Sequence, residues 1–365
     1  MSSKRKIAVV GAGWYGCHLA SELIRMGEDV TIFEQSDKVF NGSSGFNQFR
    51  LHLGFHYPRS SKTRAQVVES YRRFVDRYPH LIYPVTKNVY GIANVESMVD
   101  YNTYRIIMEH DCPVPFEELD PAAFGLTNLE GALLCQEGAL LAKEPQRFFE
   151  ALLRDYIMYN SRINSVRSVV NESDEPTGVE VNGQFFDWCL DCTYGQLMGF
   201  AGTAIYYEPC LTLIYHRKDK NVRHLSEAIT VMDGQFVSLF PYFEDYADAR
   251  GDLRRLHTLT HVKYTHLAKF DNFQDAKQFV ANFTAQDAEA LRPKFEAEIM
   301  KYLPNFKERF DYQSYFLSYK TKTPSSADAR ETMCEVNGRV LSVMSGKVNT
   351  IFEAEDFVMS VLGYK

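Results

Sequence analysis

The strongest constraint on this fold lies in the first tenth of the chain, where an apolar strand, a glycine-rich turn, a helix and a second strand follow one another. Residues 7–10 form the apolar run, Gly11, Gly13 and Gly16 follow it, and Glu34 ends the second strand. The first glycine permits a tight turn, the second lets the backbone approach a pyrophosphate, and the third lets the helix pack on the strand. An acid roughly 20 residues on hydrogen-bonds a ribose 2′-OH and disfavours a 2′-phosphate. The segment predicts a dinucleotide-binding site.

The alternative is an ordinary strand-to-helix turn, because a G-x-G-x-x-G motif alone is weak evidence. Here the motif has the required strand before it, a helix behind it and a terminal acid. Within the helix, Cys17, Ala20, Leu23 and Ile24 fall on one face, as packing on a sheet requires, and Gly27 is placed as a C-terminal cap. We therefore expect the helix N-terminus, with its unpaired N–H groups, to face the phosphates.

The composition is that of a soluble globular protein with about two domains. Charged residues make up 24% of the 365 residues and hydrophobic residues 45%. The net charge of −7 argues against a general affinity for nucleic acid or anionic membranes, although a local basic groove stays possible. No apolar run approaches the ~20 residues that span a bilayer, and residues 1–6 lead straight into the first strand. We expect a cytoplasmic protein.

The cysteines favour buried thiols over a metal or redox site. The chain has seven, an odd number, and Cys189 and Cys192 match C-x-x-C. No second Cys or His pair lies at zinc-site spacing, and the residues before Cys189 read as a strand. We therefore predict no metal site.

The rest of the chain alternates helical and strand-like patterns without repeats. Asn182 and Gly183 form a strong hairpin signal between two short strands. We predict helices over 62–78, 97–110, 144–159 and 273–303, and strands over 87–94, 133–141, 163–171, 177–182, 185–192 and through 206–263, before a final strand–turn–helix.

Two further segments give the chain a family resemblance that runs nearly end to end. Residues 42–48 form a Ser/Gly-rich loop after the dinucleotide motif, and Thr193 and Gly195 close a later strand with Tyr194 inserted between them. With the N-terminal motif, these segments resemble the flavoprotein superfamily of D-amino-acid oxidase, glycine oxidase and monomeric sarcosine oxidase. In such proteins the Ser/Gly-rich loop touches the FAD pyrophosphate.

The C-terminal segment supports the same resemblance. Residues 340–344 form an apolar strand, Gly346 and Lys347 a turn, and residues 351–363 an amphipathic helix. In the resembling family this helix N-terminus lies against the flavin ring, where N–H groups and the dipole stabilise negative charge. The family fixes the glycine and the helix, and Lys347 and Asn349 are our additions. The alternative is a plain surface turn that opens a last helix.

The resemblance implies an α/β protein with a Rossmann-like FAD-binding domain and a discontinuous α+β substrate domain built on a mainly antiparallel sheet. Residues 1–80, 131–205 and 325–365 would form the first domain, and 81–130 and 206–324 the second. The cofactor is then FAD. The expected FAD-binding residues are Gly11, Gly13, Trp14, Tyr15, Gly16, Glu34, Gln35, Ser43, Ser44, Asn47, Gln48, Arg50, Val166, Thr193, Gly195, Gly346, Lys347, Val348, Asn349 and Thr350.

Residues 47–59 hold the densest set of chemically useful side chains and are predicted to form a strand with one polar face. Alternation puts Gln48, Arg50 and His52 on the same side. In one interpretation Arg50 and His52 only bond backbone or FAD. In the other, Arg50 or Arg59 clamps a substrate carboxylate, while His52 or His56 tunes the flavin or shuttles a proton. Some relatives attach FAD covalently through a His or Cys, and a His here is a candidate.

The middle of the chain supplies the expected substrate-binding sheet. Tyr242, Thr260, His261 and Tyr264 lie on alternating strands and are candidates for substrate contact, with cross-strand packing as the alternative. The segment before the last strand resembles a family loop that carries an active-site Arg or Asp, so Arg330 is a second candidate carboxylate clamp. The catalytic candidates are Arg50, His52, Lys347, Arg330 and His261.

The resulting hypothesis is an FAD-dependent oxidoreductase that oxidises a C–N bond of an amino acid or other amine by hydride transfer to flavin N5. The amine enters neutral, and oxygen or another acceptor reoxidises the flavin. We keep as alternatives the oxidation of a 2-hydroxy acid, a decarboxylase or lyase acting on an amino-acid-modified sugar or nucleotide, and a non-catalytic nucleotide-binding module. The sequence leaves the substrate, the acceptor and the oligomeric state open.

Overall fold

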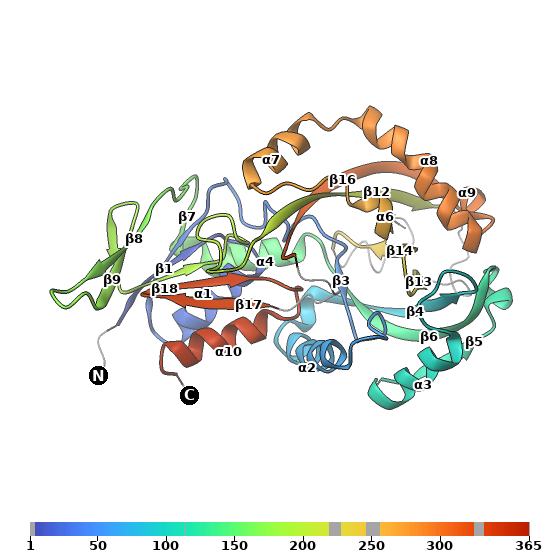
Figure 1. Cartoon of the computed structure of the whole chain (residues 1–365), viewed down its shortest axis with the longest axis horizontal. Coiled ribbons are helices and arrows are strands. Elements are labelled where there is room, and N and C mark those ends of the chain that lie inside the picture. The colour runs from blue at the N-terminus through green and yellow to red at the C-terminus, as the bar shows by residue number, and fades with distance from the viewer. Residues whose placement is uncertain (1–3, 113, 219–227, 246–255, 325–331, 365) are drawn as a thin grey trace. The chain divides into compact units, whose positions relative to one another are not determined.

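The computed structural model describes residues 4–112, 114–218, 228–245, 256–324 and 332–364, and divides into two compact units (Figure 1). The first unit comprises residues 1–45, 145–206 and 321–365, and the second comprises 46–144 and 207–320. Arg330 lies outside the described residues.

The first unit is built on a mainly parallel six-stranded sheet in the order β17-β18-β11-β1-β2-β7. Each neighbouring pair is parallel except β17 and β18. Helix α1 packs against α10 beside this sheet (Figure 1). The elements are β1 (Lys6–Val10), α1 (Trp14–Arg25), β2 (Asp29–Phe33), α4 (Glu144–Leu153), the 3₁₀ helix η3 (Arg154–Tyr156), β7 (Ile157–Met158), β11 (Trp188–Asp191), β17 (Met333–Asn337), β18 (Val340–Met344) and α10 (Ile351–Val361).

A three-stranded antiparallel sheet, β10-β9-β8, completes the first unit. Its strands are β8 (Val166–Val170), β9 (Pro176–Val181) and β10 (Gln184–Phe186). Asn182 and Gly183 join β9 to β10 with φ angles of 47° and 81°, as the primed hairpin turns require. The hairpin prediction is therefore confirmed. The single strand predicted over 185–192 is two strands, because β10 pairs with β9 whereas β11 pairs with β1.

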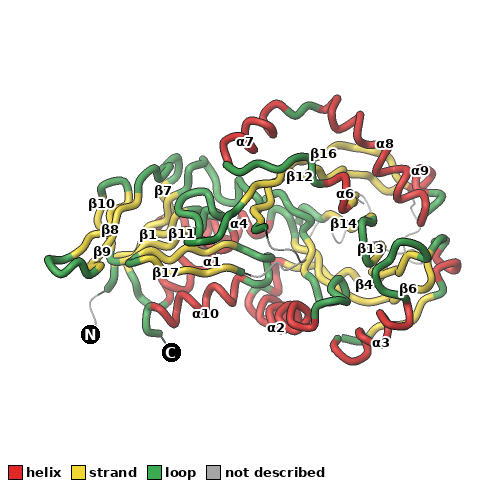
Figure 2. The backbone as a smooth tube through the Cα atoms, viewed as in Figure 1, coloured by secondary structure: helices red, strands yellow, loops and turns green. Residues whose placement is uncertain are grey.

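The second unit is a nine-stranded, mostly antiparallel sheet with helices on it (Figure 2). Its path is β16-β12-β15-β14-β13-β4-β6-β3, β5 pairs with β6, and β13 and β4 run parallel. The elements are β3 (Arg50–Leu51), α2 (Ser61–Arg77), η1 (Pro79–Leu81), β4 (Ile82–Ala93), α3 (Tyr101–Asp111), β5 (Phe116–Leu119), η2 (Pro121–Phe124), β6 (Leu129–Leu140), β12 (Tyr206–Arg217), β13 (Ala228–Met232), β14 (Val237–Tyr242), β15 (Leu256–His261), α6 (Val262–Thr265), α7 (Phe273–Asn282), α8 (Ala285–Tyr302), α9 (Phe306–Arg309) and β16 (Phe310–Lys322). Together the two units form the expected α/β architecture.

The two faces of the second sheet differ in chemistry. Ile229, Leu239 and Leu259 pack into a core that contains Phe295 of α8. Side chains alternate along a strand, so Thr230, Ser238 and Thr260 project from the opposite face. The sheet therefore has one apolar, helix-covered face and one face that carries hydroxyl groups.

Residues 46–80 and 131–144 belong to the second unit, whereas the sequence-based division placed them in the first domain. The physical reason is strand pairing. β6 pairs with β4 along most of its length, and β3 pairs with Ala139 and Gly138 of β6. These hydrogen-bonded ladders tie both segments to the large sheet.

The strand predicted over 47–59 is reduced to Arg50 and Leu51. Phe49 has a φ of 51° and Gly54 a φ of 103°, and neither value fits an extended strand. The segment is therefore a loop around a two-residue strand.

Several predicted boundaries also differ. Helix α3 begins at Tyr101 because Asp100 caps it by accepting the Thr103 N–H. The helix expected over 144–159 ends at Leu153, because the chain then pairs as β7 with β2. The strand region predicted through residue 263 stops at His261, where a helical turn begins.

Candidate functional site

The glycine-rich turn of the first unit has the close backbone packing that the motif predicts. Gly11 has a φ of +99°, and a Cβ there would lie 2.9 Å from the carbonyl oxygen of Cys192. A Cβ on Gly16 would lie 1.9 Å from the carbonyl oxygen of Gly11. A Cβ on Gly13 would lie 2.6 Å from Ser44 Oγ. A side chain at Gly11 or Gly16 would clash with backbone atoms, and one at Gly13 would displace the Ser44 hydroxyl.

Glu34 and Ser44 hold this turn from either side. Glu34 is buried, its Oε2 accepts the Ala12 N–H at 2.9 Å, and its Oε1 accepts the Ser36 N–H at 2.9 Å. Ser44 Oγ accepts the Trp14 N–H at 2.9 Å, at the first residue of α1. The acid therefore stands beside the turn, as its predicted role at the ribose requires, while the ribose contact itself stays a prediction.

The predicted residues around the turn differ in exposure. The Trp14 ring is buried against Phe40 and Phe149, with ring centroids 5.2 and 5.7 Å away, so Trp14 offers the site its backbone and not its ring. Gln35 is exposed, and Ser43 is half-buried.

The C-terminal turn is tied to α1 through Tyr15. The Tyr15 hydroxyl donates to the Lys347 carbonyl oxygen at 2.7 Å and lies 2.9 Å from Thr350 Oγ1. Burial raises the pKa of Tyr15, so the phenol is neutral at neutral pH. Asn349 and Thr350 are buried, whereas Gly346, Lys347 and Val348 are partly exposed. The turn before α10 is therefore fixed by side chains from both ends of the chain.

Strand β11 ends in a second fixed turn. Asp191 is buried and accepts the N–H and O–H groups of Thr193 at 2.9 and 2.6 Å and the Met198 N–H at 3.0 Å. Burial raises the pKa of Asp191, and the hydrogen bonds from Thr193 oppose that rise. Tyr194 and Gly195 follow with φ angles of 64° and 79°. Asp191 was not predicted as a site residue, although its position two residues before Thr193 was a signal.

Val166 lies in β8, half-buried. Its predicted contact with FAD stays a prediction.

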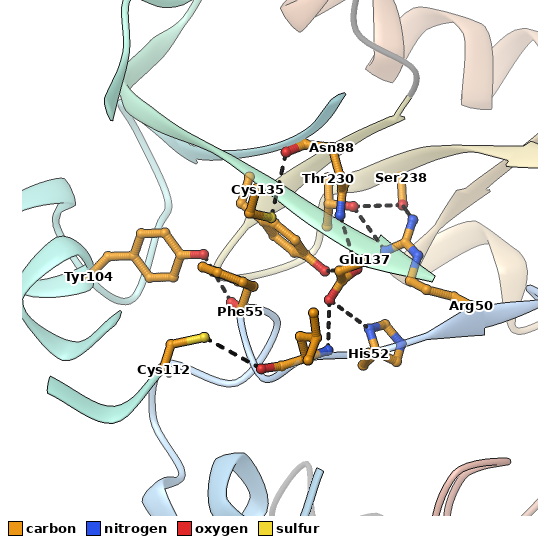
Figure 3. A network of polar contacts seen from close by, with 12 residues as sticks. Arg50, His52, Phe55, Asn88, Tyr104, Cys112, Cys135, Glu137, Thr230 and Ser238 are labelled. Atoms are coloured by element: carbon orange, nitrogen blue, oxygen red, sulfur yellow. Dashed lines mark hydrogen bonds and ion pairs between the residues drawn. The ribbon is translucent and has the colours of Figure 1, made fainter. Parts of the chain in front are cut away.

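Arg50 is buried on the hydroxyl-bearing face of the second sheet (Figure 3). Its Nη1 donates to Thr230 Oγ1 at 2.9 Å, its Nη2 donates to Ser238 Oγ at 2.6 Å, and the guanidinium carbon lies 4.1 Å from the centroid of the Phe240 ring. Its Nε is buried without an acceptor among the described residues. Two of the five N–H donors of Arg50 thus bond the sheet, and the buried Nε–H is not used by it.

A buried carboxylate lies close to Arg50. Glu137 on β6 is fully buried, and Figure 3 places it between Arg50 and His52. The carboxylate oxygen Oε1 lies 3.9 Å from His52 Nδ1. Gln48 joins the same face by donating from Nε2 to Thr260 Oγ1 at 3.2 Å, while Asn47 Oδ1 accepts the Phe49 N–H at 2.6 Å.

His261 lies on the other face of the sheet. It pairs with Val237 of the apolar core, stacks on Tyr264 with ring centroids 4.6 Å apart, and accepts the Lys263 N–H through Nδ1. Burial lowers the pKa of His261, and Lys301 lowers it further, although Glu298 acts in the opposite direction. Arg50 and His52 are therefore brought together, whereas His261 and Tyr264 are separated from them by the sheet.

A family model described as FAD dependent oxidoreductase matches residues 6–299. The chain belongs to this family. It is an enzyme, an FAD-dependent oxidoreductase, and its cofactor is FAD. The glycine turn fits that cofactor, because Gly11, Gly13 and Gly16 pack closely against Cys192, Ser44 and the turn itself, and a turn without side chains lets a dinucleotide pyrophosphate approach the backbone.

Named relatives of this FAD-dependent oxidoreductase are fungal. The FAD-dependent monooxygenase FPY4 of Fusarium mangiferae is 35% identical over 356 residues, which cover 98% of this chain and 90% of the relative. The FAD-dependent monooxygenase kojA of Aspergillus flavus is 28% identical, covering 99% and 86%.

Solved structures share the fold at lower identity. L-α-glycerophosphate oxidase from Mycoplasma pneumoniae, with FAD bound, has a TM-score of 0.72 at 12% identity and covers 100% of this chain and 96% of its own. Glycine oxidase from Geobacillus kaustophilus has a TM-score of 0.68 at 12% identity and covers 99% and 96%.

Two further properties concern the part of the chain that the structure describes. None of its helices is both long and apolar enough to cross a membrane. No group of three His, Cys, Asp or Glu side chains within it is placed to hold a metal ion.

Proposed function

We propose that this FAD-dependent oxidoreductase oxidises a C–N bond of an amino acid or another amine that carries an acidic group. The observation that carries the proposal is the buried guanidinium of Arg50. Its Nε–H has no acceptor among the described residues, and no carboxylate among them forms an ion pair with it. A buried donor on a cation favours an anionic acceptor from outside the chain.

Oxidation of an amine by FAD requires the protein mainly to orient the substrate. FAD, when bound, accepts a hydride equivalent from the carbon next to nitrogen. An amine that enters neutral needs no strong base, so hydrogen-bonding groups suffice to hold it. Gln48, Thr230, Ser238 and Thr260 offer such groups on the polar face of the second sheet. Relatives in fold include a glycine oxidase, an L-proline dehydrogenase and an L-amino acid deaminase, which supports an amine substrate.

A second candidate is the oxidation of a carbon that bears a hydroxyl group, as in a 2-hydroxy acid. An alcohol must give up its O–H proton as the hydride leaves, so it needs a base. The His52 ring, with Glu137 Oε1 3.9 Å away, is an arrangement that supplies one. L-α-glycerophosphate oxidase is among the neighbours in fold.

The names of the curated relatives favour a third reaction, insertion of an oxygen atom from O₂. That reaction consumes an external reductant such as NADPH, because one atom of O₂ leaves as water. It therefore differs from the first two in what reduces the flavin.

The deciding experiment follows the flavin absorbance of the purified holoenzyme near ~450 nm under anaerobic conditions. Panels of amino acids, amines, 2-hydroxy acids, NADH and NADPH are added singly. Bleaching by an amine supports the proposal, and release of ammonia and hydrogen peroxide on admission of air identifies the product and the acceptor. Bleaching by a 2-hydroxy acid alone establishes the second candidate. Bleaching by NADPH alone overturns the proposal in favour of oxygenation.

A further inference from the structure

We propose that Glu137 is a positioning residue, whose carboxylate holds residues 50–57 in place and fixes the orientation and charge of His52. The inference rests on the second candidate under the proposed function for the role of His52 in proton transfer, and its contacts are independent of that function. Nothing in the family match or the relatives' names assigns a role to this residue.

The carboxylate of Glu137 accepts three hydrogen bonds. Its Oε1 accepts the Leu53 N–H at 2.9 Å, and its Oε2 accepts Asn88 Nδ2 at 3.0 Å and the Tyr90 hydroxyl at 2.8 Å. These donors come from the 50–57 segment and from β4. The carboxylate therefore joins a loop, its own strand β6 and a neighbouring strand at one buried point (Figure 3).

The hydrogen-bond pattern favours the ionised form of Glu137. All three partners donate, so each needs a lone pair on the carboxylate. Burial raises the pKa of Glu137 above its ordinary value, and Arg50 and the three donors oppose that rise in part. A proton on Oε2 would displace one of its two donors, Asn88 Nδ2 or the Tyr90 hydroxyl. The negative charge is thus held close to Arg50 and to His52.

His52 is the titratable side chain that the negative charge of Glu137 affects most directly, because its Nδ1 lies 3.9 Å from Oε1. It directly precedes Leu53, whose amide Glu137 holds, and its side chain is 14% exposed. The ring lies 5.3 Å from that of His56 and 5.9 Å from that of Tyr57, between centroids. The same loop is held by two further bonds, from the Tyr104 hydroxyl to the Phe55 carbonyl oxygen and from Cys112 Sγ to the Leu53 carbonyl oxygen.

The phenol and thiol groups around Glu137 stay neutral near neutral pH. Burial raises the pKa of Tyr71 to about 12 and that of Cys112 to about 11, and raises those of Tyr90, Tyr104 and Cys135 as well. The groups that interact electrostatically with Glu137 are Arg50 from β3, His52 from the loop, Tyr71 from α2, Tyr90 from β4, Tyr104 and Cys112 from α3 and its end, and Cys135 from β6. His56 and Tyr57 lie beside the His52 ring. Arg50 and Glu137 therefore set the fixed charge that His52 experiences.

The test is a titration of the histidine rings of the holoenzyme by NMR, with His52→Asn used to assign the His52 signal. An opposite charge close by favours the protonated ring, so His52 in the wild type should titrate above the ordinary value of about 6.5. Glu137→Gln keeps the shape and removes the charge, and should lower that pKa by roughly one unit. Glu137→Asp should recover part of the shift.

Glu296→Gln is the matched control, because Glu296 is also a buried carboxylate in the second unit, bonded to Tyr215 and Arg292. It should leave the His52 titration unchanged. A wild-type His52 that titrates at or below about 6.5 would overturn the inference, and so would a Glu137→Gln protein with an unchanged His52 titration. If Glu137→Gln does not fold, the His52 titration of the wild-type protein still tests the inference.

The titration needs no substrate, so it separates this inference from the proposed function. If the pKa of His52 is raised but no amine or hydroxy acid reduces the flavin, the proposed function is refuted. The effect of Glu137 on His52 would still be established. With a substrate in hand, the pH profile of flavin reduction should move toward lower pH in Glu137→Gln, which a purely structural role for Glu137 would not produce.

Discussion

The hydroxyl of Tyr15, in the first turn of α1, donates to the backbone carbonyl of Lys347 at 2.7 Å, at the other end of the chain. The dinucleotide turn and the turn before α10 are thereby held together inside one unit. In the FAD-dependent oxidoreductase family to which the chain belongs, these two turns would serve the two ends of one cofactor. The bond makes Tyr15 a link between them.

Tyr15→Phe should weaken both stability and FAD retention. The change removes one hydrogen bond to the partly exposed Lys347 carbonyl, which keeps its bond from Thr350 Oγ1 at 3.0 Å, so the expected cost is about 0.5 to 1.5 kcal/mol. Thermal unfolding and the dissociation constant of FAD measure the two effects. Tyr364→Phe is the control, because the Tyr364 hydroxyl bonds Glu28 away from both turns. Equal FAD affinity in wild type and Tyr15→Phe would show that the link does not serve the cofactor.

Gly13→Val should give folded protein without flavin. The new side chain meets Ser44 Oγ, the end of a small side chain, and fills the space where a pyrophosphate approaches the backbone. Gly11→Val should be worse for folding, because it meets the Cys192 carbonyl at a positive φ. Gly42→Ala lies in the same region with open space around its Cβ and should keep its flavin. Flavin content of purified Gly13→Val at the wild-type level would remove the dinucleotide site from this turn.

Arg50→Lys should reduce the rate of flavin reduction by substrate, although the charge is kept. An ammonium cannot donate to Thr230 and Ser238 in the fixed geometry of the fork and also keep a donor for an external acceptor. Rapid-reaction kinetics measure the rate, and Arg292→Lys, at a surface ion pair, is the control. A rate within about twofold of wild type, below ~0.4 kcal/mol in barrier, would assign Arg50 to the structure of the sheet alone.

His261 should make the protein less stable in mild acid. Its folded pKa is lowered, so the unfolded chain binds the proton more tightly and stability is lost as pH falls below the unfolded value of about 6.5. Denaturant unfolding at pH 7.5 and 5.5 measures the loss, and His261→Gln should reduce it. His110→Gln, at an exposed position, should not. An equal loss in His261→Gln and wild type would contradict this account.

Local requirements explain what the sequence predicted well. The glycine turn, the Gly27 cap and the Asn182–Gly183 hairpin each depend on backbone angles that few residues adopt, so the residue type reveals the structure. The polar segment 47–59 was predicted less well. The positive φ of Phe49 is imposed by its surroundings, and a phenylalanine gives no sign of it.

Long-range pairing explains what the sequence left out. β16, a 13-residue strand, was not predicted, because its mixed burial gives no clean alternation. Glu137 was not named either, since its role depends on β6 lying beside both β3 and β4. Predicting that His261 lies on the apolar face would have required the register of β14 against β15. No local sequence pattern fixes that register.

The order of the strands in the first sheet has a consequence for synthesis. β18 pairs with β11 and β17 lies outside β18, yet both follow all the strands of the second unit in the chain. Until they emerge from the ribosome, β11 presents an open edge of backbone donors and acceptors while the strands of the second unit are already made. A nascent or truncated chain that ends before β17 is thus expected to aggregate through β11, and pairing with β18 should remove this tendency.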